Sequence, residues 1–286
     1  MPEWNLKEYK KMIYHHMLEE VMYHEDDIDT LREKLVEKQR NHKLDEREIN
    51  RLFGEEVDTK YMREFWEARV QTHKLNEGMT NLEDDAELLK LKLQQERPKM
   101  RKYINPNKKM IMLDLGSGYG TWTFEFANNV KLIHAVDYIK DMADIGNKQA
   151  EKNNIKNVEF FNKSIQNFTS PIKYDTVLLS GVCIYQNDSD MKKIIERIKG
   201  YTKVDTKLIV RDSTGINNRY VIEKEYSERL GTMYSAIYRT REEYTKMFAK
   251  AGFVLIKDED MFEEGSPLNK YKETRLRIYE FVRLRV

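Results

Sequence analysis

The sequence is poor in cysteine, with Cys183 as the only thiol in 286 residues. One cysteine excludes an internal disulfide framework and any multi-cysteine zinc or iron–sulfur site. No second histidine or cysteine lies four residues after His15, His16 or His24, so we expect no bound metal. No run approaches the roughly 20 apolar residues that span a bilayer, and the first residues lack the apolar core of a secretory signal. We therefore expect a cytoplasmic protein.

Glycine and proline are scarce in the first third of the chain. Of the 12 glycines only Gly54 and Gly78 precede residue 100, and no proline lies between Pro2 and Pro98. Because both residue types interrupt helices, this stretch is predicted to be helical. We assign residues 1–97 to a helical arm that serves oligomerisation or docking.

A nearly heptad seam of apolar or small residues runs from Val57 to Leu93 with spacings of three and four. A continuous helix of this length would extend about 55 Å, too far to be covered on one side by a small domain. It would need a partner helix. Two interpretations stay open: solvated helices that each bury one stripe, or a coiled coil that makes the protein a homo-oligomer.

Neither sign of charge dominates, because the net charge is +1. Residues 1–100 carry 24 acids and 18 bases, a net of −6, and residues 101–286 carry 25 acids and 32 bases, a net of +7. The excess of bases in the second part favours anionic ligands. It is too small for the basic patch of a dedicated nucleic-acid binder, so nucleic acid is not the expected partner.

From residue 98 onward the pattern changes to short apolar runs separated by helical stretches. The expected strands are 110–115, 131–136, 158–161, 176–179, 208–210, 253–256 and 277–282, and the expected helices are 142–153, 188–199 and 240–251. Strands that alternate with helices predict an α/β fold with a doubly wound, mostly parallel sheet over residues 98–286. No helix separates the last two strands, which predicts an antiparallel last strand.

The strongest local signal is the run from Ile111 to Trp122. A strand leads into Gly116, Gly118 and Gly120, and a helix is expected from about Thr121. Glycines permit backbone angles that other residues avoid, and they let a ligand approach the main chain. The helix start also offers free N–H groups. Dinucleotide-binding proteins share such turns, so the turn alone leaves the ligand open.

Two acids accompany this turn. Asp114 lies two residues before the first glycine, and Asp137 ends the second strand. A carboxylate at that strand end can accept hydrogen bonds from both hydroxyls of a ribose. With this arrangement, residues 100–286 resemble the class I S-adenosylmethionine-dependent methyltransferases. The resemblance implies a Rossmann-like fold, S-adenosylmethionine as the cofactor, and methyl transfer as the reaction.

The resemblance also implies which residues contact the cofactor. The glycines would lie beneath its methionine and ribose, with Asp114 near its amino group and Asp137 on the ribose. After the third strand, where the family often has an acid beside the adenine, this chain has Ser164 and Ile165. The expected cofactor-binding residues are Asp114, Gly116, Ser117, Gly118, Gly120, Asp137, Ser164, Ile165 and Ser180.

Two acceptor motifs of methyltransferases are missing from the sequence. One is the Asn/Asp-Pro-Pro-aromatic signature that grips exocyclic amines of nucleic-acid bases, and the other is the glutamate pair that holds a guanidinium. Their absence disfavours methylation of nucleic-acid bases and of protein arginine.

An insert at about residues 212–240 interleaves tyrosine with arginine. These side chains suit a polar acceptor with hydroxyls and a carboxylate or phosphate, so we expect a substrate cap. Packing against the N-terminal helices is the alternative. Residues 266–271 with Arg275 are expected to close the same rim. The expected substrate-binding residues are Arg211, Tyr220, Tyr234 and Arg239.

Asp212, directly after the fifth strand, is the expected general base, with Tyr185 and Tyr238 as further candidates. The sequence therefore predicts a methyltransferase that acts on a small or glycan-like polar acceptor at oxygen, without a metal. Two alternatives remain. The enzyme methylates RNA or protein docked by the helical arm, or the chain is a scaffold with a vestigial cofactor site.

Overall fold

The computed structural model describes residues 57–72, 78–83 and 85–284. The three N-terminal histidines and the helical stripes before residue 57 lie outside these residues. From Val57 onward the chain forms one unit by its internal contacts. Across the described ranges, no helix is long and apolar enough to cross a membrane.

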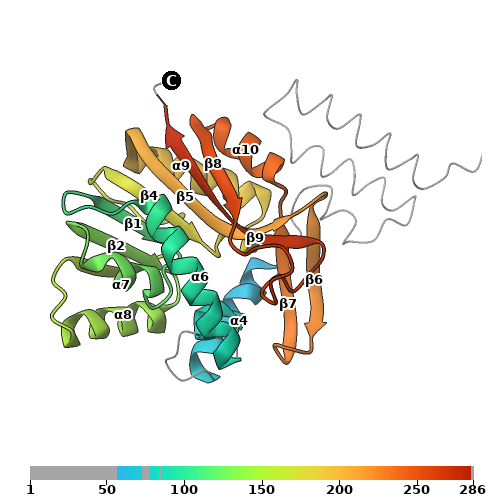
Figure 1. The fold of residues 1–286 in the computed structure, drawn as a ribbon. Helices are drawn as coiled ribbons and strands as arrows, with labels where there is room; N and C mark the ends of the chain where they lie inside the picture. The colour runs from blue at the N-terminus through green and yellow to red at the C-terminus, as the bar shows by residue number, and fades with distance from the viewer. Residues whose placement is uncertain (1–56, 73–77, 84, 285–286) are drawn as a thin grey trace, which may run out of the picture. The chain divides into compact units, whose positions relative to one another are not determined.

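A seven-stranded sheet forms the centre of the domain, in the order β3-β2-β1-β4-β5-β9-β8 (Figure 1). Its strands are β1 Ile111–Leu115, β2 Leu132–Asp137, β3 Val158–Asn162, β4 Tyr174–Ser180, β5 Thr202–Gly215, β8 Phe253–Asp260 and β9 Thr274–Arg283. Neighbouring strands from β1 to β5 pair in parallel, and β9 runs antiparallel to both β5 and β8. The predicted α/β fold with an antiparallel last strand is confirmed.

Helices cover both faces of the sheet. Successive residues of a strand point to opposite sides, so a strand of consecutive apolar residues needs cover on both faces. They are α6 Ala86–Ile104, α7 Thr121–Ala127, α8 Lys140–Lys152, α9 Asp188–Tyr201 and α10 Arg241–Ala249. Met112 of β1 packs with side chains of α6 and α7, whereas its neighbour Leu113 packs with those of α9 and α10. In Figure 1, α6, α7 and α8 lie in front of the sheet.

In its described residues, the segment that carries the heptad seam contains the helices α4 Thr59–Thr72, α5 Gly78–Asn81 and α6. The single long helix considered for this segment does not form. Leu82 takes a left-handed backbone with φ 50°, and Asp85 caps a new helix by accepting the N–H groups of Glu87 and Leu88. The seam residues Phe65 and Leu93 are buried within this chain. Helix α6 crosses residue 97, and oligomerisation through the arm stays a prediction.

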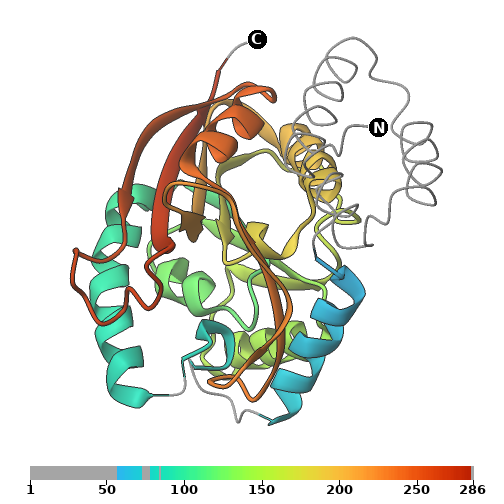
Figure 2. The same ribbon diagram turned by 90° about the vertical axis from the view of Figure 1, so that its right-hand side faces the viewer.

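The insert at 212–240 contains a two-stranded hairpin that the sequence analysis did not predict. Strand β6 Tyr220–Ser227 pairs antiparallel with β7 Thr232–Tyr238. Figure 2 shows the hairpin beside α4, and Tyr61 Oη of α4 donates to Met233 O at 3.0 Å. The expected alternative, packing of the insert against the N-terminal helices, is thus present. Whether it also caps a substrate depends on the cavity described below.

Helix α8 packs tightly on β3 at Gly146, where an added Cβ would lie 2.5 Å from Phe160 Cε1. We expect Gly146→Ala to lower the free energy of unfolding by about 1–3 kcal/mol, because the neighbouring ring has to shift. Gly200→Ala in α9 is the control, since a Cβ there meets nothing within 4 Å. It should raise stability by up to about 1 kcal/mol. Denaturant unfolding measures both, and a stabilised Gly146→Ala variant would contradict this packing.

Candidate functional site

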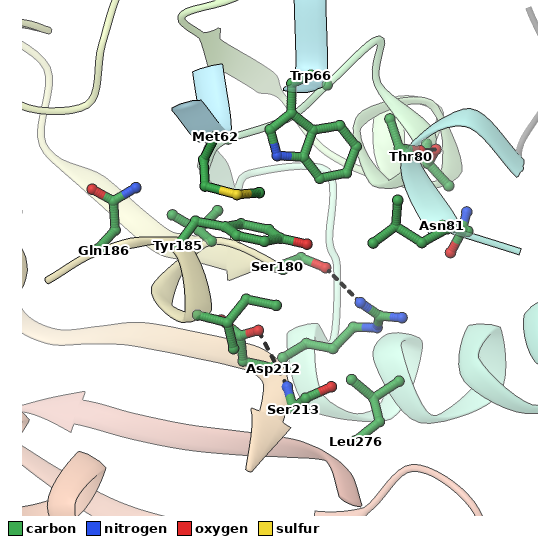
Figure 3. Close-up of a pocket in the computed structure, with 18 of the residues that line it drawn as sticks. Met62, Trp66, Thr80, Asn81, Ser180, Tyr185, Gln186, Asp212, Ser213 and Leu276 are labelled. Atoms are coloured by element: carbon green, nitrogen blue, oxygen red, sulfur yellow. Dashed lines mark hydrogen bonds between the residues drawn. The ribbon is translucent and has the colours of Figure 1, made fainter. Parts of the chain in front are cut away.

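A cavity of about 600 Å³ lies at the carboxyl ends of β1, β2, β4 and β5, beside the glycine turn. Open α/β sheets bind ligands at this edge. Residues of helices α4 and α5, of the β6–β7 hairpin and of the segment 268–276 also line the cavity. Figure 3 shows Met62 and Trp66 of α4 facing Tyr185, with Ser180 and Asp212 on the opposite side.

The glycine turn needs residues without a side chain. Gly116 and Gly118 have φ values of +72° and +56°, a left-handed backbone that L residues rarely adopt. A Cβ on Gly116 would lie 2.3 Å from Val182 Cγ2. The N–H groups of Gly116 and Ser117 both donate to Val136 O, at 2.8 and 3.1 Å. These bonds fix the end of β1 against the end of β2.

Asp137 is held by two backbone N–H groups at the end of β2. Its Oδ2 accepts from Gly118 N at 2.9 Å, and its Oδ1 accepts from Ile139 N at 2.8 Å. Burial raises the pKa of this carboxyl to about 6, and the two N–H groups oppose the shift. An ionised carboxylate offers about four lone-pair sites, so each oxygen can accept one more hydrogen bond. The geometry suits a pair of hydroxyl donors.

Asp114 lies almost fully buried in β1 and lines the same cavity. Thr123 Oγ1 donates to its Oδ2 at 2.6 Å. Burial raises the pKa of Asp114 to about 7, and the charge of Asp137 adds to this rise. A cationic group of a ligand would lower the pKa again. The site therefore offers a carboxylate suited to an ammonium group.

Most other expected cofactor contacts also line the cavity, namely Ser117, Ser164, Ile165 and Ser180. Gly120 does not. A Cβ on Gly120 would lie 2.6 Å from Phe160 Cζ, so this glycine permits close packing of the first helix against the sheet. The cofactor contact expected of Gly120 stays a prediction, because this glycine is not among the lining residues.

Three tyrosines form one wall of the cavity. Tyr185 Oη lies 2.9 Å from Tyr234 Oη, and Trp66 meets the Tyr185 ring edge-on at 5.6 Å. Burial raises the pKa of Tyr185, Tyr234 and Tyr238 above their ordinary range. At neutral pH these hydroxyls keep their protons. They suit hydrogen bonding to a ligand, and the expectation of Tyr185 or Tyr238 as a proton acceptor is not supported.

Asp212 is fully buried in β5 and lines the cavity beside the tyrosines. Its Oδ2 accepts from Cys183 N at 2.7 Å, and its Oδ1 accepts from Ser213 N at 3.2 Å. Burial raises its pKa to about 6, so the carboxylate is mostly charged at neutral pH. Asp212 thus holds the short helix η1 Cys183–Tyr185 in place and can also accept a proton.

Arg211 lines the cavity, but its guanidinium is already held by this chain. Its Nη2 donates to Glu96, its Nη1 donates to Ser180 Oγ at 3.2 Å, and its Cζ lies 5.7 Å from the Trp122 ring. Glu96 is fully buried in α6. This buried ion pair fastens α6 to β5 at the edge of the cavity.

Two expected substrate-binding residues lie outside the cavity lining. Arg239 is fully buried outside the cavity lining and donates to Cys183 O, Gln186 O and Asp188. Its guanidinium satisfies main-chain carbonyls around η1, so no donor points to a ligand. Tyr220 stacks on the Tyr238 ring at 5.9 Å and also lies outside the lining. A sequence run cannot tell which face of a hairpin is covered.

Several lining residues were not predicted. They come from the segment α4 to α6, from the loop after β2 and from the start of α8: Met62, Arg63, Trp66, Thr80, Asn81, Leu82, Lys92, Tyr138, Ile139 and Met142. For the residues of α4 to α6, the only sequence signal is the apolar seam. That seam predicts contact with a partner helix as well as it predicts contact with a cavity. Residues 268–271 line the rim as expected, whereas Arg275 donates to Tyr271 O outside the lining.

A family model described as a methyltransferase domain matches residues 106–252, just over half of the chain. Phosphoethanolamine N-methyltransferase 1 of Triticum aestivum is 25% identical over 203 residues, covering 68% of this chain and 39% of that relative. A probable cobalt-precorrin-6B C(15)-methyltransferase (decarboxylating) of Methanocaldococcus jannaschii is 25% identical over 126 residues, covering 44% of this chain and 64% of the relative. The chain therefore spans less than two thirds of the length of both relatives.

Solved structures share the fold. The 1,6-didemethyltoxoflavin-N1-methyltransferase of Burkholderia thailandensis, with bound S-adenosylhomocysteine, has a TM-score of 0.58 at 14% identity and covers 79% of this chain and 90% of its own. Magnesium protoporphyrin IX methyltransferase of Synechocystis, with bound S-adenosylmethionine, has a TM-score of 0.54 at 16% identity, covering 79% and 97%. Together with the family match, the glycine turn and its two carboxylates, this identifies the chain as a member of the class I S-adenosylmethionine-dependent methyltransferases.

Proposed function

We propose that this methyltransferase acts on a small polar acceptor rather than on a macromolecule. The observation that carries the proposal is that α4, α5, the β6–β7 hairpin and residues 268–276 all contribute walls to the cavity at the strand ends. Its volume of about 600 Å³ lies in the range of small-ligand sites. The two relatives above are named for methyl transfer to phosphoethanolamine and to a cobalt-precorrin, which supports the same class of acceptor.

The residues present fit S-adenosylmethionine, which supplies a methyl group on a sulfonium when bound. We assign the ribose hydroxyls to the free lone pairs of Asp137 and the ammonium group to Asp114. The left-handed turn at Gly116 and Gly118 leaves the main chain open to the ligand, since a side chain on Gly116 would collide with Val182. Ser164 and Ile165 lie where the adenine is expected.

On the acceptor side, Asp212 is the residue that can hold a proton released from a hydroxyl. Its carboxylate is mostly charged at neutral pH. The hydroxyls of the neighbouring Tyr185 and Tyr238 stay protonated and can orient the acceptor. We therefore keep oxygen as the proposed methylated atom.

The acceptor class and atom can be tested with S-adenosylmethionine that carries a carbon-13 methyl group. The protein is incubated separately with a small-metabolite extract, total RNA and a protein extract. We expect label in the small metabolites, with the methyl chemical shift of an O-methyl group. Label in RNA or protein would support the docking alternative, an N-methyl or C-methyl shift would overturn oxygen, and no label would support the scaffold.

Asp137→Ala should weaken S-adenosylmethionine binding roughly ten- to hundredfold, because hydrogen bonds to a charged acceptor contribute about 1.5–3 kcal/mol. Asp144→Ala is the control, since Asp144 is exposed on α8 and pairs with Lys140. Calorimetric titration of both variants and the parent gives the affinities. Unchanged binding by a folded Asp137→Ala variant would remove Asp137 from the ribose site.

Asp114→Asn should change how stability depends on pH. The native carboxyl has a pKa of about 7, above the unfolded value of 3.8, so the native state binds more protons between these values. This contribution is present below about pH 4 and is lost as pH rises through about 7. Relative to the parent, the neutral variant should therefore gain stability over this window. Exposed Asp144→Asn serves as the control, and a pH-independent difference for Asp114→Asn would contradict the shifted pKa.

If Asp212 accepts the proton, kcat of the parent should rise with pH through about 6, as the carboxyl ionises. Asp212→Asn should lower kcat about a hundredfold or more while S-adenosylmethionine binds as before. Asp190→Asn is the matched control, because Asp190 is half-buried on α9 outside the cavity lining. A flat pH profile of the parent would contradict the proposal even if Asp212→Asn fails to fold.

A further inference from the structure

Five charged side chains gather at one end of the cavity, and we name this group the basic corner. Its members are Glu83, Lys92, Glu96, Arg211 and Lys270. Glu83 precedes α6, Lys92 and Glu96 lie on α6, Arg211 lies on β5, and Lys270 belongs to the rim before β9. Residues far apart in sequence thus bring three cations and two carboxylates together.

Four of these side chains form two ion pairs within the chain. Arg211 donates to fully buried Glu96, and Lys270 donates to buried Glu83. Each pair is neutral as a unit. The remaining member is Lys92, so the basic corner carries one uncompensated positive charge.

The ammonium of Lys92 has a single neutral partner. Its Nζ donates to Asn81 O at 3.1 Å, and within the described ranges no carboxylate lies at ion-pair distance from it. Burial lowers the pKa of Lys92 to about 8, although Glu96 opposes the shift. A cation held in a partly buried wall without a counter-charge costs free energy that a bound anion would recover.

We propose that the basic corner is a carboxylate subsite in which Lys92 receives the negative charge of a bound molecule. This inference rests on the proposed function, because it assigns one end of the same cavity. One surplus positive charge matches one carboxylate. Arg211 and Lys270 stay paired with Glu96 and Glu83 and line the subsite beside Lys92.

Two molecules can supply that carboxylate. The strand order places Asp137 on β2, Asp114 on β1, Ser180 on β4 and Arg211 on β5, one beside the next. A cofactor with its ribose on Asp137 and its ammonium on Asp114 would have its amino-acid carboxylate beyond Asp114, and the basic corner would be the group that receives it. The other source is a carboxylate on the acceptor.

The titration of Lys92 itself distinguishes these sources. Lysines labelled with carbon-13 at Cε are followed by NMR over a pH series on the full chain, and the Lys92 signal is assigned by its loss in Lys92→Met. S-adenosylhomocysteine carries the amino-acid end, whereas 5′-methylthioadenosine has the same nucleoside without it. If the cofactor is the source, S-adenosylhomocysteine should raise the pKa of Lys92 by about one unit or more, and 5′-methylthioadenosine should leave it unchanged.

If the acceptor is the source, neither nucleoside should move the Lys92 signal. Acetate added to the S-adenosylhomocysteine complex should then raise the pKa of Lys92. A signal that moves with none of the three probes would overturn the subsite. Acetate is also titrated into the free protein. If the protein binds neither nucleoside, the proposed function is wrong, and the acetate titration still shows whether Lys92 receives a carboxylate.

Calorimetry provides an independent readout. With the cofactor as source, Lys92→Met should weaken S-adenosylhomocysteine roughly tenfold or more relative to 5′-methylthioadenosine, and Lys92→Arg should restore much of the affinity. Lys90→Met is the matched control, because Lys90 lies on the same helix but is exposed and outside the cavity. Equal weakening of both ligands by Lys92→Met would indicate a structural effect and overturn the assignment.

Discussion

The left-handed backbone at Gly116 and Gly118 is the constraint on which the site depends. Only this conformation lets successive N–H groups of the turn reach Val136 O and the Asp137 carboxylate. The ends of β1 and β2 are thereby joined, and Asp137 is oriented with one acceptor site free on each oxygen. Helix α5 packs on the same turn, because Thr80 Cγ2 lies 2.8 Å from a Cβ built on Gly118. The turn therefore also contributes to the position of α5.

Electrostatics follow from that arrangement. The fold buries Asp114, Asp137 and Asp212 in the cavity walls and raises the pKa of each, while hydrogen-bond donors of the chain satisfy them only in part. Such groups reduce stability in the free protein and become favourable when a ligand supplies the missing donors or charges. Lys92 is a cationic group that lines the same cavity. A cavity lined by both carboxylates and an ammonium favours a ligand that carries both charges.

The segment before the sheet is part of the site. Val57 exchanges two hydrogen bonds with the side chain of buried Asn187, at 2.9 and 2.8 Å. Helix α4 then brings Met62 and Trp66 to the cavity and packs against the β6–β7 hairpin. The glycine turn and strand ends are elements that members of this fold share, whereas this wall belongs to the helices and the insert. We therefore propose that acceptor selectivity depends on them.

The sequence by itself determined the sheet, its antiparallel last strand, the glycine turn and the carboxylates beside it. These features depend on local periodicity and on residues within about 25 positions of one another, which a single chain displays directly. Tertiary structure alone decided that the seam would break at Leu82, that Arg239 would hold main-chain carbonyls, and that Lys92 would lie near Arg211 without a partner carboxylate. An apolar stripe indicates that some element covers it, but the sequence does not show which element. A charged residue likewise does not show which residue will lie beside it. The covering element and the neighbouring residue both come from segments distant in the chain.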